Sequence, residues 1–397
     1  MKHSLESTVI RLMLLVRRAG AKMGVCLWPL QRMLSSLLPS AAIDVANQPV
    51  HLSDGINDRD LAPLLAMLPT KKRNGSCLCD NDISHKEDYD LEIIIPAYNV
   101  EHYIDQCLQS VLNQQSKYNY LVVVINDGST DGTRQRLANY KKYPNIEIIN
   151  QENAGLAAAR NVALKHIRGR YVTFVDSDDW LLPGAIDMLM DTATKYDADI
   201  VEGCFRLFSG ARFYPGNSHP FEVTTHWTGQ LQGYPWGKVL RAELFLHFRF
   251  PEDYLFEDTL MTLILFPRCH CIVTIPDDIY VYRFNPVGIT ATAGLSPRAV
   301  ESLLVTIQLM EDGAASGQKT SQLDYENFLQ NEVPNTFCTI FSLHNPSVNH
   351  HVFSVCCRLL HQYYQGYTTS DPHLQPLEHA LHTKDYRACM LAVMTRH

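Results

Sequence analysis

Four short apolar runs rich in β-branched residues recur in the middle of this 397-residue chain. They start 25 to 30 residues apart, at Leu91–Ile95, Leu121–Ile125, Ile146–Ile149 and Tyr171–Val175. Runs of this kind are typical of strands buried on both faces of a parallel sheet. The segments between them repeat apolar residues at helical spacing. The pattern therefore predicts an α/β fold built from successive βαβ units.

Polar residues follow each of the four runs. The segments are Pro96–Asn99, Asn126–Gly132, Gln151–Asn161 and Asp176–Asp179. Because the carboxyl ends of parallel strands share one edge of a sheet, we expect these segments to line one crevice, where open α/β folds bind ligands. Any single segment could be an ordinary turn, since Asp-Gly and Asn-x-Gly are common turn formers. Four in succession favour a binding site.

The fourth segment brings three carboxylates, Asp176, Asp178 and Asp179, to one strand end. Crowded carboxylates repel one another unless a cation shares them, and oxygen ligands suit Mg²⁺ or Mn²⁺ better than zinc. Two Asp around one residue cannot enclose a divalent ion alone, so they leave coordination positions for a substrate's phosphates. This arrangement is what a nucleotide-dependent transferase needs. Asp179 could instead cap a helix that begins near Pro183.

Composition excludes some classes of function. The net charge of -8 argues against general binding to nucleic acid, which needs a basic excess. The 11 cysteines are scattered and odd in number, and we expect no secretory signal, so free thiols in a reducing cytoplasm are favoured. A zinc site could be imagined from Cys77, Cys79, Cys269 and Cys271, but the two-residue spacing is not that of the usual zinc knuckle and favours chance.

The two ends of the chain differ from its middle. Within the first forty residues, six Lys and Arg stand against one Glu, with leucines and Trp28 between them. No apolar run there reaches the roughly 18 residues needed to span a bilayer. The segment fits either an anionic membrane surface or a helix packed on the protein, and both readings stay open. Residues 297–397 show helical periodicity, for which a helical cap on the core is the favoured role.

With these motifs in view, the chain closely resembles the family 2 glycosyltransferases, nucleotide-sugar enzymes of the GT-A fold. The resemblance covers about residues 91–290 and rests on Ile93–Asn99, Asn126–Asp131, Asn153–Asn161, Phe174–Asp179, Trp236–Lys238 and Phe256–Thr259. Within the family, the resemblance is strongest to bacterial enzymes that build capsule, exopolysaccharide or O-antigen chains. It implies a GT-A domain over residues 89–295, with a mostly parallel sheet flanked by helices. Residues 1–88 would be a basic segment and linker, and residues 296–397 a helical region.

The resemblance implies which residues hold the donor, a UDP-sugar. They are Pro96, Tyr98, Asn99, Asp127, Asn153, Arg160, Asp176 and Arg283. Tyr98 offers a flat face for stacking on uracil, and the Asp127 carboxylate can accept its N3–H. Asp178, together with Asp176, would ligate Mn²⁺ or Mg²⁺ and so bridge to the diphosphate.

The resemblance also implies a base and an acceptor wall. Asp258 would take the proton of the acceptor hydroxyl, while Glu257 would bind the acceptor or act as the base itself. Adjacent helical residues point about 100° apart, so only one can face the anomeric carbon. Two acids in a first helical turn could instead complement the helix dipole. Trp236 and Lys238 would line the acceptor site, with Lys238 near a phosphate or an acidic acceptor.

Two other functions share parts of this pattern. A phosphohydrolase of the haloacid dehalogenase type also has a strand that ends in Asp-x-Asp, but a Gly-Thr pair would follow where this chain has Asp179 and Trp180. A non-catalytic sugar-nucleotide-binding relative would be expected to lose the metal-binding Asp or the acidic pair. We therefore expect a metal-dependent, inverting hexosyltransferase of cell-surface polysaccharide biosynthesis. Its acceptor would be a saccharide or a lipid-linked saccharide at the cytoplasmic face of the plasma membrane.

Overall fold

The computed structural model describes most of the chain beyond the N-terminal segment. The described residues are 56, 58–68, 75–79, 83–286, 288–289, 296–340, 343 and 345–395. The chain divides into two compact units. The first, which holds the sheet, comprises residues 74–286 and 308–317, and the second comprises residues 1–73, 287–307 and 318–397.

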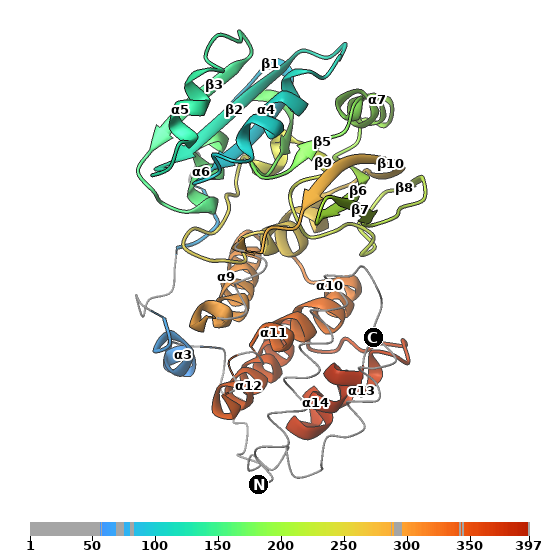
Figure 1. Ribbon diagram of the computed structural model, residues 1–397. Coiled ribbons are helices and arrows are strands. Elements are labelled where there is room, and N and C mark those ends of the chain that lie inside the picture. Colours follow the sequence, from blue (N-terminus) through green and yellow to red (C-terminus); the bar gives the residue numbers. More distant parts are fainter. Residues whose placement is uncertain are drawn as a thin grey trace. The chain divides into compact units, whose positions relative to one another are not determined.

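One mixed sheet forms the framework of the first unit (Figure 1). Its described strands are β1 (Ser84–Ala97), β2 (Tyr120–Asp127), β3 (Ile146–Gln151), β4 (His166–Phe174), β5 (Trp180–Leu181), β6 (Ile200–Ser209), β7 (Arg212–Pro215), β8 (Glu222–Thr224), β9 (Lys238–Arg241) and β10 (Ile272–Arg283). Their order is β3-β2-β1-β4-β9-β6-β10-β5, with β7 beside β6 and β8 beside β10.

The half of the sheet made by β3, β2, β1 and β4 is parallel throughout, as the four apolar runs predicted. The other half is mixed, because β9 is antiparallel to both β4 and β6, whereas β10 is parallel to β6. The expected α/β fold is thus confirmed, but the expectation of a mostly parallel sheet holds for one half only. The strands β5 and β9 are too short to produce a periodic apolar signal in the sequence.

Helices pack on this sheet through the apolar faces that the sequence predicted. The helix α4 (Ile104–Leu112) buries Ile104, Leu108 and Val111 in the main core. The other described α-helices of this part are α5 (Thr133–Ala138), α6 (Leu156–Leu164) and α7 (Ala185–Tyr196), and the short turns are η2 (Ala242–Phe245), η3 (Met261–Leu265) and η4 (Phe266–Arg268). Each fully buried aliphatic side chain of this core contributes about 1.5–3 kcal/mol.

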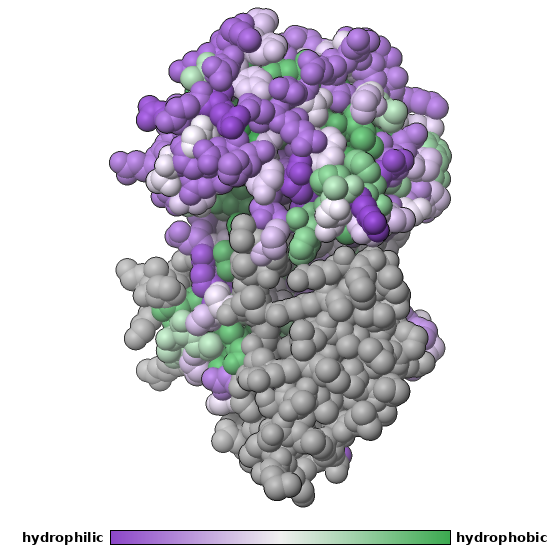
Figure 2. Space-filling view, in the orientation of Figure 1, coloured by the Kyte–Doolittle hydropathy of each residue, from purple (hydrophilic) through white to green (hydrophobic). Residues whose placement is uncertain are grey.

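The face of the first unit seen in Figure 2 is mostly hydrophilic, and its apolar side chains gather over the half of the sheet that holds β5, β6 and β10. Phe213, in β7, is 54% exposed. Its ring lies 5.1 Å from that of Phe208 and 6.3 Å from that of Trp180.

The described part of the second unit is helical, as predicted for the C-terminal region. Its elements are α3 (Asp58–Leu65), η6 (Pro297–Val300), α10 (Gln322–Asn327), η7 (Phe328–Glu332), α11 (Val333–Ile340), α12 (Pro346–Tyr363), α13 (Gln375–Thr383) and α14 (Tyr386–Thr395), while α9 (Glu301–Ala315) belongs in part to each unit. An ion pair between Asp60 and Arg358 joins α3 to α12. Ser321 and Asp324 form a capping box that starts α10.

The two readings of the basic N-terminal segment, as a membrane-binding segment or as a packed helix, concern residues outside the helices named above. Of the helices in the described ranges, none combines the length and the apolar character needed to cross a membrane. The basic segment of residues 1–40, on which the two readings depended, lies outside the described residues.

Candidate active site

Hydrogen bonds join the loops that follow β1 and β2. Asn99 has a left-handed backbone, with φ 52°, which Asn tolerates better than most residues. Its Oδ1 accepts a hydrogen bond from the Thr130 N–H at 2.8 Å, and its own N–H donates to Ser129 Oγ at 3.1 Å. Pro96 is buried at the end of β1, whereas Tyr98 is 49% exposed. The ring of Tyr98 is therefore open for stacking, as a base-binding residue requires.

The Asp127 carboxylate is anchored by the loop that follows β3. It is 3% exposed and accepts hydrogen bonds from Gln151 Nε2 at 2.7 Å, the Ala154 N–H at 2.8 Å and the Gly155 N–H at 2.9 Å. Asn153 Nδ2 donates to the Asp127 carbonyl at 3.1 Å. A carboxylate has about four acceptor positions. The bonds to these described residues use three of them, which fits one further donor such as a base N–H.

Asp179 ties the end of β4 to β10. It is 1% exposed and accepts hydrogen bonds from the Tyr280 hydroxyl at 2.8 Å and the Arg283 N–H at 2.6 Å. The expected helix cap is therefore wrong, since α7 begins after Gly184 and Asp179 is engaged elsewhere. Burial, reinforced by repulsion from Asp176 and Asp178, raises the pKa of Asp179 well above its usual range.

Asp178 lies at the surface of the same turn, partly exposed. Its Oδ2 accepts from Asn285 Nδ2 at 3.1 Å, and its carbonyl accepts from Arg283 Nε at 2.7 Å. The Arg283 guanidinium stacks on Trp180, 4.6 Å from the ring centroid. Arg283 thus lies beside the aspartates, as expected for a residue near the diphosphate.

Arg160, on α6, joins two acidic groups that are far apart in the sequence. Its Nη2 lies 3.1 Å from Asp176 Oδ1, and its Nη1 lies 2.7 Å from Glu257 Oε1. The guanidinium carbon also lies 5.2 Å from the ring centroid of Phe250. Arg160 is only 2% exposed. The guanidinium is thus enclosed and holds two carboxylates, and its expected part in holding the nucleotide stays a prediction.

The two acids at 257 and 258 have different surroundings. Glu257 is 4% exposed and paired with Arg160, whereas Asp258 is partly exposed. Burial raises the pKa of Glu257 to about 7, against the lowering effect of Arg160. Burial also raises the pKa of Asp258. The chain after them forms η3, a wide π-type turn of the kind often found at functional sites, not the regular helix expected.

Trp236 belongs to a wall of stacked aromatic rings and is itself buried. It is 6% exposed and stacks on Tyr234 at 3.7 Å and on Tyr280 at 4.6 Å between ring centroids. Tyr280 thus stacks on Trp236 and also donates a hydrogen bond to Asp179. Sequence reasoning missed that role; the signal available was that Tyr280 lies three residues before Arg283, which the resemblance assigns to the donor site.

Lys238 lies under this wall and is 0% exposed. Its Nζ lies 2.9 Å from Glu202 Oε2 and donates to the carbonyls of Gln232 at 3.2 Å and Tyr234 at 2.5 Å. The expectation that Lys238 contacts the acceptor is therefore corrected. Its ammonium group is enclosed and fixes the segment that precedes Trp236. The partner Glu202, also 0% exposed, lies in a strand that carried no motif.

Asp176 and Asp178 fit a hard divalent cation by the chemistry of their oxygens. Burial and the neighbouring Asp178 both raise the pKa of Asp176, which a cation would reverse. In the described ranges, no three His, Cys, Asp or Glu side chains gather closely enough to hold a metal by themselves. A cation at this pair would have coordination positions open to water or to oxygen atoms of a substrate.

Comparisons with known proteins agree with this geometry. The family model described as glycosyl transferase family 2 matches residues 92–250. Glycosyltransferase GlyA of Streptococcus pneumoniae is 30% identical over 284 residues, which cover 62% of this chain and 41% of that protein. The uncharacterized glycosyltransferase EpsJ of Bacillus subtilis is 33% identical over 217 residues, which cover 50% of this chain and 62% of that protein. The chain thus spans less than two thirds of either relative.

Among solved structures, S. aureus TarS in complex with UDP-GlcNAc is similar, with a TM-score of 0.54 and 21% identity over 77% of this chain and 90% of that chain. At that identity the likeness concerns the fold, and it confirms the GT-A architecture. The family match leaves the phosphohydrolase alternative without support. Residues 92–250, with their motif loops gathered at the carboxyl ends of β1 to β4, thus form a region that is similar to the glycosyltransferases of family 2.

Proposed function

We propose that this glycosyltransferase moves a hexose from a UDP-sugar to a hydroxyl of a saccharide or lipid-linked acceptor, with inversion and with the help of Mn²⁺ or Mg²⁺. The observation that carries the proposal is the Arg160 bridge, with 3.1 Å to Asp176 and 2.7 Å to Glu257. It makes the strand-end aspartates and the acidic pair parts of one site. Sugar transfer needs both, one group for the leaving diphosphate and one for the acceptor proton.

The donor is held by the loops after β1, β2 and β3. Tyr98 stacks on the uracil, and Asp127 accepts its N3–H. Pro96 ends β1 at this point, while Asn99 and Asn153 fix the loops around the base through the hydrogen bonds described above. The binding of UDP-GlcNAc by TarS, a protein of the same fold, supports a UDP-sugar as donor.

Asp178, with Asp176, would hold Mn²⁺ or Mg²⁺, which when bound neutralises the charge that develops on the departing diphosphate. Arg283 lies against the same turn, with its Nε bonded to the Asp178 carbonyl at 2.7 Å. It adds positive charge beside the diphosphate and holds the aspartate turn in place. Asp179, deeply buried, supports that turn from behind.

Asp258 removes the proton from the acceptor hydroxyl as that oxygen attacks the anomeric carbon. Its partly exposed position allows contact with an acceptor, whereas Glu257 is occupied by Arg160. Attack from the face opposite the diphosphate inverts the configuration in a single displacement. Trp236 and its stacked neighbours form the acceptor wall, which Lys238 supports from within.

We also propose that the acceptor belongs to a cell-surface polysaccharide, met at the cytoplasmic face of the membrane. The basis is the resemblance of the motifs to capsule and exopolysaccharide enzymes, together with six Lys and Arg against one Glu in residues 1–40. Basic residues near a surface are attracted to anionic lipid by about 1 kcal/mol each.

A donor panel tests the proposal. UDP-glucose, UDP-galactose and their N-acetyl forms are incubated with the protein, Mn²⁺ and a mixture of saccharide and lipid-linked acceptors, and release of the nucleoside diphosphate is measured, UDP from these donors and GDP from the control donor. GDP-mannose serves as the control donor. Release from at least one UDP-sugar, dependent on acceptor, is expected. Turnover of GDP-mannose alone, or binding of UDP-sugars without any release, would contradict the proposal, and the second result would indicate a non-catalytic binder.

A further inference from the structure

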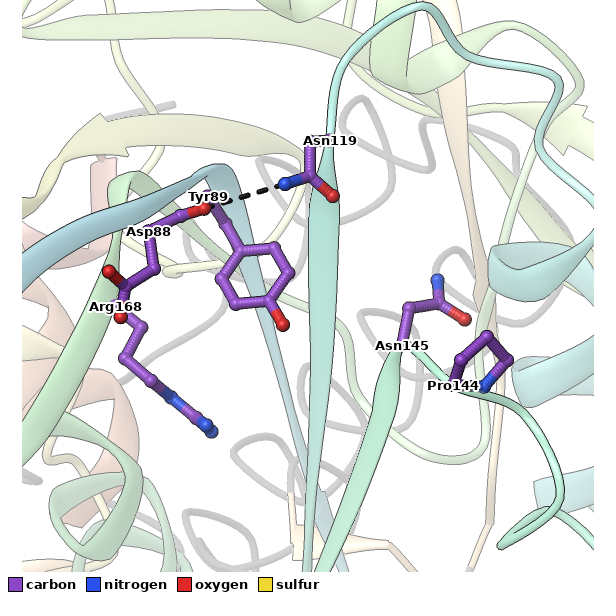
Figure 3. A pocket seen from close by; sticks show the side chains of 6 residues that line it. All are labelled: Asp88, Tyr89, Asn119, Pro144, Asn145 and Arg168. Carbon is purple, nitrogen blue, oxygen red and sulfur yellow. Dashed lines mark hydrogen bonds between the residues drawn. The ribbon is translucent and has the colours of Figure 1, made fainter.

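A second groove opens at the opposite edge of the sheet from the candidate active site. Its volume is about 540 Å³, and its lining residues are Asp88, Tyr89, Asn119, Pro144, Asn145 and Arg168 (Figure 3). These residues lie at the amino ends of the parallel strands, whereas the active site lies at their carboxyl ends. Along β1, Tyr89 and Pro96 are separated by about 23 Å, at 3.3 Å per residue. The groove is therefore not part of the donor site.

The groove exists because β1 begins before its neighbour β2. In the described pairing, β2 first meets β1 at Leu91, while the earlier residues of β1 pair with β4 only. The β1–β4 pairing shifts register between His85 and Tyr89. Such a bulge redirects side chains, and here the ring of Tyr89 points into the groove (Figure 3).

The backbone around this bulge is closely packed. Gly169 pairs with Tyr89, and a Cβ at Gly169 would lie only 2.5 Å from the Tyr171 carbonyl oxygen and 2.6 Å from the Glu92 nitrogen. Only glycine fits such an approach. The position of Tyr89 is thus fixed by the sheet and not by a loose loop.

The polar groups of the groove are held in place and balanced in charge. Asn119 Nδ2 donates to the Asp88 carbonyl at 3.4 Å, and the Asn119 N–H donates to Asp90 Oδ2 at 2.9 Å. Arg168 Nη2 donates to Glu147 Oε2 at 2.5 Å. Because Glu147 neutralises Arg168 and Asp88 adds a negative charge, the groove lacks the excess of positive charge that phosphate binding requires.

The same lining suits a neutral sugar chain. Hydroxyl groups both donate and accept hydrogen bonds, and the groove offers two amides, a carboxylate and a guanidinium around one aromatic ring. The C–H face of a sugar packs on such a ring, and the cavity falls within the usual size of a small-ligand site. An apolar peptide would cut these polar groups off from water and offer their remaining donor and acceptor positions nothing in return.

We propose that this groove is a second saccharide site, which binds a neutral oligosaccharide segment of the acceptor or product away from the reaction centre. The identity of that segment rests on the proposed function. A short acceptor reaches only the active site, whereas a long chain engages both sites and gains effective concentration. The groove then lowers KM for long acceptors and leaves kcat and short acceptors unchanged.

The direct test is ligand-observed NMR on the full-length protein without donor or metal, with maltohexaose, cellohexaose and chitohexaose as probes. At least one probe should bind, and Tyr89→Ala should weaken its binding about fivefold to tenfold through loss of ring stacking. Tyr89→Phe keeps the ring and should bind like the wild type. Tyr214→Ala, which removes a part-buried tyrosine of β7 outside the groove, is the matched control.

Asp88→Ala provides a second variant at an exposed position, for the case that Tyr89→Ala does not fold. It too should weaken binding. The inference is overturned if none of the three probes binds, or if these variants bind as tightly as the wild type. Failure of UDP release with probe binding intact would instead count against the proposed function alone, and normal release without probe binding would count against the groove alone.

Discussion

Arg160 and Glu257, 97 residues apart in the sequence, form a buried ion pair with 2.7 Å between Nη1 and Oε1. Both residues are almost fully buried, at 2% and 4% exposure. The pair engages Glu257, whereas the neighbouring Asp258, for which we propose contact with the acceptor, is more exposed. It also links the loop of the acidic pair to Asp176, so that the two halves of the site hold a fixed relation.

Replacing Arg160 by Ala should destabilise the protein by about 3–5 kcal/mol, because it leaves the buried Glu257 carboxylate and the partly buried Asp176 carboxylate without this counter-charge. Urea denaturation followed by circular dichroism measures this change. The control is Arg170→Ala, whose ion pair with Asp197 has side-chain exposures of 44% and 73%. An exposed pair is worth about 0–1 kcal/mol. Equal losses in the two variants would show that the Arg160 bridge does not hold the site together.

Stability should depend on pH through Glu257. Its pKa is raised from 4.5 to about 7 by burial, so the folded state favours the protonated form. The contribution of Glu257 to the free energy of unfolding is fully present below the pKa that Glu257 has in the unfolded state. It is lost as the pH rises towards about 7, by at most about 1.4 kcal/mol per pH unit.

Glu257→Gln stays neutral and should lack this loss. The measurement is the free energy of unfolding of both proteins across this pH window, taken as a difference so that other titrating groups cancel. A difference that stays constant with pH would contradict the raised pKa of Glu257.

The outcome shows what the sequence could and could not predict. The strand ends followed from apolar periodicity, and the place of Tyr98 at one of these ends followed from its motif; both are local signals. The resemblance implied that Arg160 holds the donor and that Lys238 lines the acceptor site, because both are charged residues within matched motifs. Their burial depends on Glu257 and Glu202, partners supplied by distant segments, and no local pattern reports such partners.

Asp178→Ala should abolish metal-dependent transfer while the fold remains intact, because removing one of several crowded carboxylates also relieves repulsion. UDP release with Mn²⁺ or with EDTA measures the loss, and the melting temperature reports on the fold. Asp187→Ala, on α7 and away from the strand end, is a control for loss of an acidic residue. Near-normal turnover of Asp178→Ala in EDTA would rule out the metal assignment.

Deleting residues 1–40 should release the protein from anionic liposomes at low salt and leave transfer to water-soluble acceptors unchanged. Co-sedimentation measures the first effect and UDP release the second. A matched variant keeps the apolar residues but replaces by Gln the basic side chains Lys2, Arg11, Arg17, Arg18, Lys22 and Arg32. It should be released as well. Unfolding of the truncated protein would identify the segment as a structural part of the protein.

The most direct test of the central claim compares wild type with Asp258→Asn in UDP release from the accepted donor, with Mn²⁺ and acceptor present. UDP binding, measured by calorimetry, should be the same in both proteins. The turnover of Asp258→Asn should fall by about 10²–10⁴, the usual effect of losing a positioned base. Undiminished turnover by Asp258→Asn would contradict the account and move the base to another residue.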